Sequence, residues 1–169
     1  MLKLLKRLLP ALPILAFATS SHAATSADVR IEPSAAQNGP HMLTEHTASA
    51  VIQDYLQSWK SLSAALEENR ADLLNMDFSG AAREKLGETI HEQAAAGLST
   101  QYRDSAHDIQ IVFSSPEGLS IQLTDTVAYD LQVLDHGKSI SSQHITTRYI
   151  VVLTPAEARW KVRVFQATN

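Results

Sequence analysis

The chain has 169 residues, 14 Lys and Arg against 18 Asp and Glu, a net formal charge of −4 and no cysteine. The lack of cysteine excludes disulfides, thiolate nucleophiles and thiolate metal sites. The acidic balance disfavours nucleic-acid binding, because a negative protein repels a phosphate backbone. The length suits one domain of ordinary size.

Residues 1–23 have the layout of a secretory signal peptide. Met1–Arg7 carries three cations, Leu8–Ala18 is uncharged and mostly apolar, and small residues precede a cleavage point after Ala23 or Ala24. The apolar run is much shorter than the roughly 20 residues that span a bilayer. We therefore expect an exported protein, periplasmic or secreted, with no stable membrane span after cleavage. Cleavage removes three cations and no acid, so the formal charge falls from −4 to −7.

Residues 24–43 are expected to be a flexible linker, because they bury too little apolar surface to offset the entropy of ordering. From residue 44, apolar side chains recur at steps of three and four, which predicts a helix of about six turns. A short second helix over 69–78 and a third helix over 81–98 follow. The apolar face of the first helix consists of Val51, Ile52, Tyr55, Leu56, Trp59, Leu62 and Leu66.

From Tyr102 onward the apolar period changes to two, which predicts β-strands. Alternating residues mark four strands, over 109–113, 119–133, 145–153 and 160–164, with a bend near Asp125 in the second. Short turns join them, so the strands form an antiparallel meander. The predicted fold class is α+β, with three N-terminal helices packed on a curved, cone-like, four-stranded antiparallel sheet in a single domain over 44–169.

This order of elements resembles the nuclear transport factor two-like superfamily, a cystatin-like α+β cone. The resemblance covers about residues 44–168. It depends on the first helix through 55–59 (Tyr-Leu-Gln-Ser-Trp), the helices after it, and the terminal strand 158–165 (Ala-Arg-Trp-Lys-Val-Arg-Val-Phe). It implies a long helix in a curved sheet around a pocket; a cystatin-like or other helix-on-sheet fold is the alternative. Members include enzymes, adaptors and domains without chemistry, so the resemblance assigns no function.

No pattern in the chain assigns a catalytic residue, a metal site or a cofactor. His41 and His46 are five residues apart, whereas a metal pair on a helix needs three or four. The sequence contains neither a nucleophile elbow nor a phosphate-binding glycine loop.

Several residues are candidates for acid–base chemistry, but the sequence does not select one of them. His107 and Asp108 are neighbours in a strand and point to opposite faces. Three carboxyl groups can each be proposed as a base, those of Asp108, Asp125 and Asp130. Tyr129 or Tyr149 can be proposed as the oxyanion donor. Nothing in the spacing distinguishes them from solvated acids.

The ligand-binding candidates are six residues: Tyr55, Trp59, Tyr129, Tyr149, Arg148 and His144. His144 and Arg148 share one strand face, which meets either a pocket or solvent. We therefore expect a non-catalytic binding domain for a small apolar molecule in the cone or a protein partner on the sheet, without cofactor. A homodimer through the sheet is a further expectation. The alternatives are a small pocket enzyme of isomerase or hydratase-like lyase type, and an accessory domain of an envelope complex.

Overall fold

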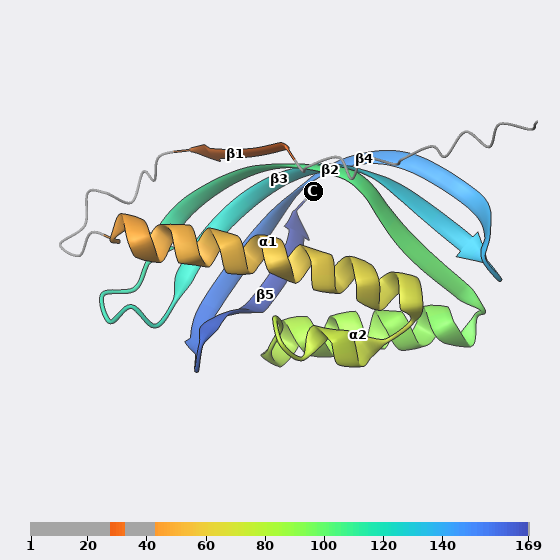
Figure 1. Ribbon diagram of the computed structural model, residues 1–169, viewed down its shortest axis with the longest axis horizontal. Helices are drawn as coiled ribbons and strands as arrows, with labels where there is room; N and C mark the ends of the chain where they lie inside the picture. The colour runs from red at the N-terminus through yellow and green to blue at the C-terminus, as the bar shows by residue number, and fades with distance from the viewer. Residues whose placement is uncertain (1–27, 33–42, 169) are drawn as a thin grey trace, which may run out of the picture.

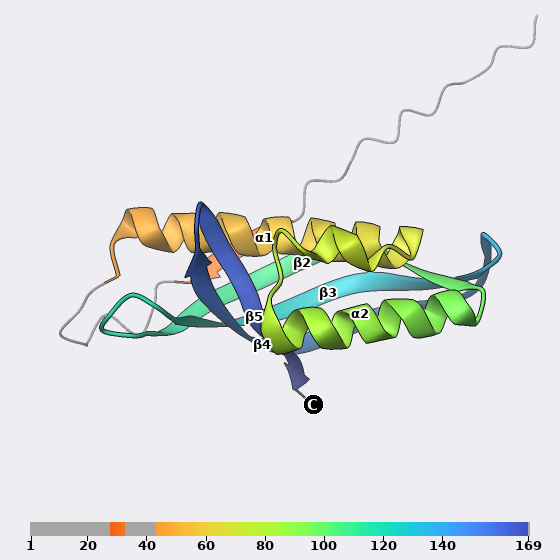
Figure 2. The same ribbon diagram turned by 90° about the horizontal axis from the view of Figure 1, so that it is seen from below.

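The computed structural model describes residues 28–32 and 43–168. Its elements are β1 (Asp28–Glu32), α1 (Glu45–Glu68), the 3-10 turn η2 (Ala71–Leu74), α2 (Gly80–Ala95), β2 (Leu98–Ser114), β3 (Ile121–Asp135), β4 (Lys138–Ala156) and β5 (Arg159–Thr168). Both helices lie on the concave side of one curved sheet (Figure 1, and from below in Figure 2). The predicted signal peptide falls outside the described residues.

Helix α1 is the long amphipathic helix that the apolar spacing predicts. Thr44 caps its N-terminus by accepting a hydrogen bond from the Thr47 N–H at 3.2 Å, which satisfies a backbone donor that the first turn leaves free. The helix ends where Asn69 adopts a left-handed conformation with φ of 56°. Its buried face consists of Val51, Ile52, Tyr55, Ser58, Trp59, Leu62, Ala65 and Leu66.

The sheet has five strands in the order β1-β2-β3-β4-β5. Strands β2 to β5 form the predicted antiparallel meander, but β1 joins it parallel to β2. The prediction of a four-stranded, wholly antiparallel sheet was therefore wrong in this detail. The additional strand, residues 28–32, lies in the segment expected to be a flexible linker. Its Val29 side chain packs against the core, and this contact stabilises the strand on the sheet.

The predicted second helix is also wrong, because only the 3-10 turn η2 forms in that stretch. The backbone after it pairs with β5 instead: Val162 N–H donates to Asp77 O at 2.8 Å, and Ser79 N–H donates to Val162 O at 2.9 Å. Phe78, between these two residues, is 1 % exposed. Backbone groups committed to a strand cannot also close helical turns, so two α-helices result rather than three.

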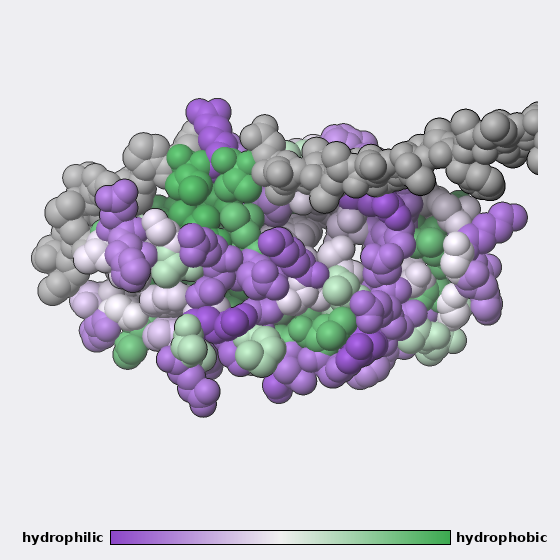
Figure 3. Space-filling view, in the orientation of Figure 1, coloured by the Kyte–Doolittle hydropathy of each residue, from purple (hydrophilic) through white to green (hydrophobic). Residues whose placement is uncertain are grey.

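The hydrophobic core lies between α1 and the concave face of the sheet, and Ile90 closes it from α2. Within 28–32 and 43–168, no helix is long and apolar enough to cross a membrane. Much of the face seen in Figure 3 is hydrophilic, with an apolar patch where β1 lies above the first half of α1. Ile31 of β1 is 55 % exposed.

Candidate functional site

A buried carboxylate stands in the middle of the concave face. Along β3 the side chains alternate, so Asp125 shares its face with Leu123 and Val127, and all three are completely buried. The Asp125 Oδ2 atom accepts a hydrogen bond from the hydroxyl of Tyr55 on α1 at 2.7 Å. It also lies 2.7 Å from Nδ1 of His107 on β2. The same carboxylate oxygen thus joins the helix to two strands.

The strand register explains how these groups meet. Asp125 pairs with Ile109 of β2 and with Tyr149 of β4. His107 stands two residues before Ile109 and therefore occupies the diagonal position on the same face, within reach of a long side chain. Tyr55 reaches Asp125 from the helix side of the sheet, because it lies on the buried face of α1.

Aromatic rings surround this carboxylate. The Trp59 ring lies in edge or tilted contact with five others, which belong to Tyr102, His107, Tyr129, Tyr149 and Phe165. The hydroxyls of Tyr129 and Tyr149 are 3.3 Å apart. We call Tyr55, Trp59, His107, Asp125, Tyr129 and Tyr149 the inner cluster.

Two polar atoms of the inner cluster have no hydrogen-bond partner among the described residues: Asp125 Oδ1 and Trp59 Nε1. Buried polar groups in proteins are nearly always paired, and leaving one unpaired costs about 1–3 kcal/mol. A contact with the Trp59 indole lowers the pKa of Tyr55 against the larger rise from burial, but the Trp59 N–H makes no hydrogen bond of full geometry. One acceptor and one donor are therefore open beside the same tyrosine.

Burial controls the ionisation of the tyrosines. It raises the pKa of Tyr55 well above the usual value of 10.0, and the negative charge of Asp125 adds to the rise. It likewise raises the pKa of Tyr102 and of Tyr149, the latter with help from the Tyr129 hydroxyl. These three hydroxyls therefore stay protonated at neutral pH, and that of Tyr55 donates to Asp125.

The rim of the concave face is less tightly closed than its centre. Four of its side chains are half-buried and pack against the core from the edge: Tyr102, Leu131, Ile145 and Phe165. Within the described residues, no group of three or more His, Asp or Glu side chains is placed to hold a metal ion.

Four of the six predicted ligand-binding residues come together in the inner cluster, namely Tyr55, Trp59, Tyr129 and Tyr149. The other two, His144 and Arg148, lie on the outer face of the sheet. His144 Nδ1 is 2.7 Å from Asp130 Oδ1, and Arg148 donates to the Thr124 hydroxyl at 3.3 Å. Both side chains are exposed, so the structure separates them from the aromatic residues.

Sequence reasoning missed Tyr102 and Phe165. It weighed His107 only beside Asp108, and it did not select Asp125 from the three acids. A signal for Asp125 was present, because it lies in phase with Leu123 and Val127 on the apolar face of its strand. An acid in such a position is buried, and a buried acid needs partners. Asp108 is exposed instead, consistent with a solvated acid.

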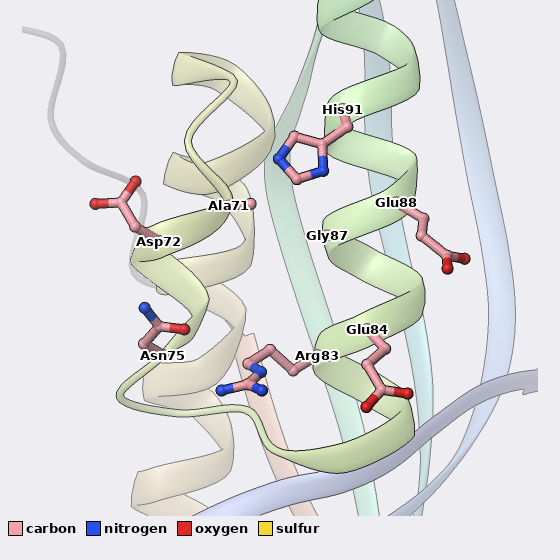
Figure 4. A pocket seen from close by; sticks show the side chains of 8 residues that line it. All are labelled: Ala71, Asp72, Asn75, Arg83, Glu84, Gly87, Glu88 and His91. Carbon is pink, nitrogen blue, oxygen red and sulfur yellow. The ribbon is translucent and has the colours of Figure 1, made fainter.

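A hollow lies between η2 and α2, away from the inner cluster (Figure 4). Its volume is about 440 Å³, and its lining residues are Ala71, Asp72, Asn75, Arg83, Glu84, Gly87, Glu88 and His91. Arg83 and His91 project towards η2, whereas Glu84 and Glu88 point to the other side of α2 (Figure 4). Most of its lining residues are polar or charged types and are exposed.

Neither a family model nor a curated protein matches the chain. Solved structures do match it. The intermembrane space region of the chloroplast protein ARC6 is 15% identical with a TM-score of 0.59, covering 75% of this chain and 98% of that one. A putative scytalone dehydratase from Novosphingobium aromaticivorans is 13% identical with a TM-score of 0.46, covering 75% and 89%. At 15% identity the likeness to the ARC6 region concerns the fold alone.

Proposed function

We propose that this protein is a non-catalytic binding domain that holds a small, neutral, largely apolar molecule with one hydroxyl group against the concave face of its sheet. The observation that carries the proposal is the pair of unpaired buried atoms, Asp125 Oδ1 and Trp59 Nε1, among aromatic rings. A hydroxyl both donates and accepts, so one such group satisfies both atoms. Pockets for small molecules are typically apolar with a few placed polar groups.

The electrostatics favour a neutral molecule. Asp125 Oδ2 already has two hydrogen-bond partners, the Tyr55 hydroxyl and Nδ1 of His107, and any additional buried charge needs a partner of its own. No free cation or further acid lies in the inner cluster. An uncharged hydroxyl therefore fits better than a carboxylate or an amine.

Two compounds that differ only in the hydroxyl provide the test. We expect benzyl alcohol to bind saturably and about tenfold or more tightly than toluene, because an unpaired buried polar group costs about 1–3 kcal/mol. The chain has two tryptophans, Trp59 and Trp160, so its ¹H–¹⁵N spectrum shows two indole signals, assigned with the variant Trp160→Phe. Benzyl alcohol should shift the Trp59 signal and leave that of Trp160 in place. Equal shifts of both signals, or equal affinity for the two compounds, would contradict the proposal.

One observation favours a second candidate, a small pocket enzyme of isomerase or hydratase-like lyase type. Tyr55, Asp125 and His107 form a continuous chain of short hydrogen bonds in a buried interior, and a histidine oriented by a carboxylate is a common general base. Exchange of the α-protons of cyclohexanone into D₂O, followed by NMR, distinguishes the two candidates. Exchange by the native protein that His107→Gln abolishes supports an enzyme, and equal exchange supports binding alone.

A further inference from the structure

Strand β4 extends well beyond the strand on its outer side. It runs from Lys138 to Ala156, but β5 pairs only with its second half, from Arg148 opposite Thr168 to Ala156 opposite Arg159. On its other side β3 accompanies it from Lys138 onward. Residues 139–147, which we call the open β4 edge, thus have a strand on one side only, and alternate residues point their N–H and C=O groups outward.

The open β4 edge is exposed. Its exposed side chains are Ser139, Ile140, Ser142, Gln143, His144 and Thr146, and the others are half-buried. Among residues 28–32 and 43–168, its main chain forms no turn or loop hydrogen bond to a segment other than its strand neighbour. Ile140, at 59 % exposure, is among the most exposed large apolar side chains described.

The other free edges of the sheet are shorter or partly occupied. Along β5, Val162 exchanges backbone hydrogen bonds with Asp77 and Ser79, which shield its outer side. At the start of β2, the Asn69 side chain at the end of α1 donates to Leu98 O at 2.8 Å. Further along β2, the edge is occupied by β1. Residues 99–105 of β2 also lack a strand on their outer side in the described structure, but the nine residues of β4 are the longest open run.

The sequence of the open β4 edge lacks the usual protection against pairing. Exposed edges generally carry charges, especially Lys, or proline or bulges. Residues 139–147 contain no Asp, Glu, Lys, Arg or Pro. A register shift opposite Val133 and Leu134 places a bulge near Ile140, at one end. From residue 141 to 147 the strand is regular, so its outward N–H and C=O groups are positioned to pair with another strand.

We propose that the open β4 edge pairs antiparallel with the same edge of a second copy, which joins the two sheets into one. The charge pattern points to a second copy: the chain as a whole is negative, yet a two-fold axis across this edge sets only uncharged residues and His144 opposite one another. His144 Nδ1 lies 2.7 Å from Oδ1 of Asp130 on β3, so an acid of the same subunit accompanies this histidine. This inference is independent of the ligand proposed for the concave face.

Single cysteines give a direct test, because the natural chain contains none. In the purified full chain, Ser142, Gln143, His144 and Ile145 are replaced by Cys one at a time and oxidised with copper phenanthroline. A two-fold antiparallel pair cross-links most strongly at the position nearest its axis and weakly two residues away. Thr126→Cys, exposed on the outer face of β3, is the matched control and should stay monomeric. Cross-linking at Thr126 alone, or equally at every position, would overturn the proposal.

Sedimentation provides a second measurement that does not depend on oxidation. The native chain should show a concentration-dependent dimer, which Ser142→Lys combined with Gln143→Lys abolishes, because like charges then meet across the two-fold axis. Thr126→Lys adds charge to the outer face and should leave the dimer intact. Circular dichroism shows that each variant is folded. A native chain that is monomeric up to its solubility limit, or a dimer lost only with Thr126→Lys, refutes edge pairing.

Discussion

The hydroxyl of Tyr55 donates a hydrogen bond of 2.7 Å to Asp125 across 70 residues of sequence, and both side chains are completely buried. This contact ties α1 to the centre of the sheet through a charged group rather than through apolar packing alone. Buried carboxylates are costly unless they are hydrogen-bonded, so the contact is important for stability as well as for the proposed ligand site.

We predict that Tyr55→Phe lowers the free energy of unfolding by about 1.5–3 kcal/mol, the usual range for a hydrogen bond to a charged group. The change removes one oxygen and leaves Asp125 Oδ2 with His107 alone. Urea denaturation measures the effect. Tyr129→Phe is the matched control, because the Tyr129 hydroxyl meets only another hydroxyl at 3.3 Å and should cost less. Equal losses for both variants would contradict a special role for Asp125.

Alkaline pH should destabilise the fold through the buried tyrosines. Burial raises the pKa of Tyr55, Tyr102 and Tyr149 in the folded state above the unfolded value of 10.0. Above that pH the unfolded chain loses protons that the folded chain keeps, so stability is complete below about pH 10 and declines as the pH rises further. Phenolate absorbance at 295 nm, recorded beside circular dichroism, should show these tyrosines ionising together with unfolding. Full ionisation of a still-folded chain would disprove their burial.

Replacement of Gly87 by Ala should stabilise the protein by about 0.5–1 kcal/mol, because glycine in a helix interior is entropically unfavourable. A Cβ at this position meets only the Ala71 Cβ, at 4.0 Å. Gly97→Ala provides the contrast: Gly97 has φ of +73°, and a Cβ there comes within 3.1 Å of the His136 ring. Thermal unfolding should show the melting temperature rising for the first variant and falling for the second.

Asp77 should be a structural acid rather than a functional one. It is 2 % exposed, and Arg159 donates to its Oδ1 at 2.7 Å while Ser61 donates to Oδ2. We predict that Asp77→Ala lowers the free energy of unfolding by about 1–3 kcal/mol, since it removes the hydrogen bonds from Ser61 and from the half-exposed Arg159. Benzyl alcohol binding by the folded fraction should stay unchanged. Loss of binding without loss of stability would place Asp77 in the functional site instead.

The α1 helix and the meander of β2 to β5 followed directly from the sequence. The three- and four-residue spacing through Tyr55 and Trp59 and the two-residue spacing through Leu123 and Val127 are local signals that survive in the folded chain. The prediction of a second helix was wrong because apolar residues such as Leu74 and Phe78 can be buried either by a helix or by a segment paired with β5. Pairing with β5 decided the outcome, and that partner is more than 80 residues away.

The sequence alone determined which residues lie on one face of α1 and which alternate along each strand, because those positions depend only on helical and strand periods. Tertiary structure decided that His107, Asp125 and Tyr55 meet, and that His144 and Arg148 lie on the opposite face of the sheet from them. The physical reason is that cross-strand register and the placement of a helix over a sheet are set by packing between distant segments, which no local period encodes.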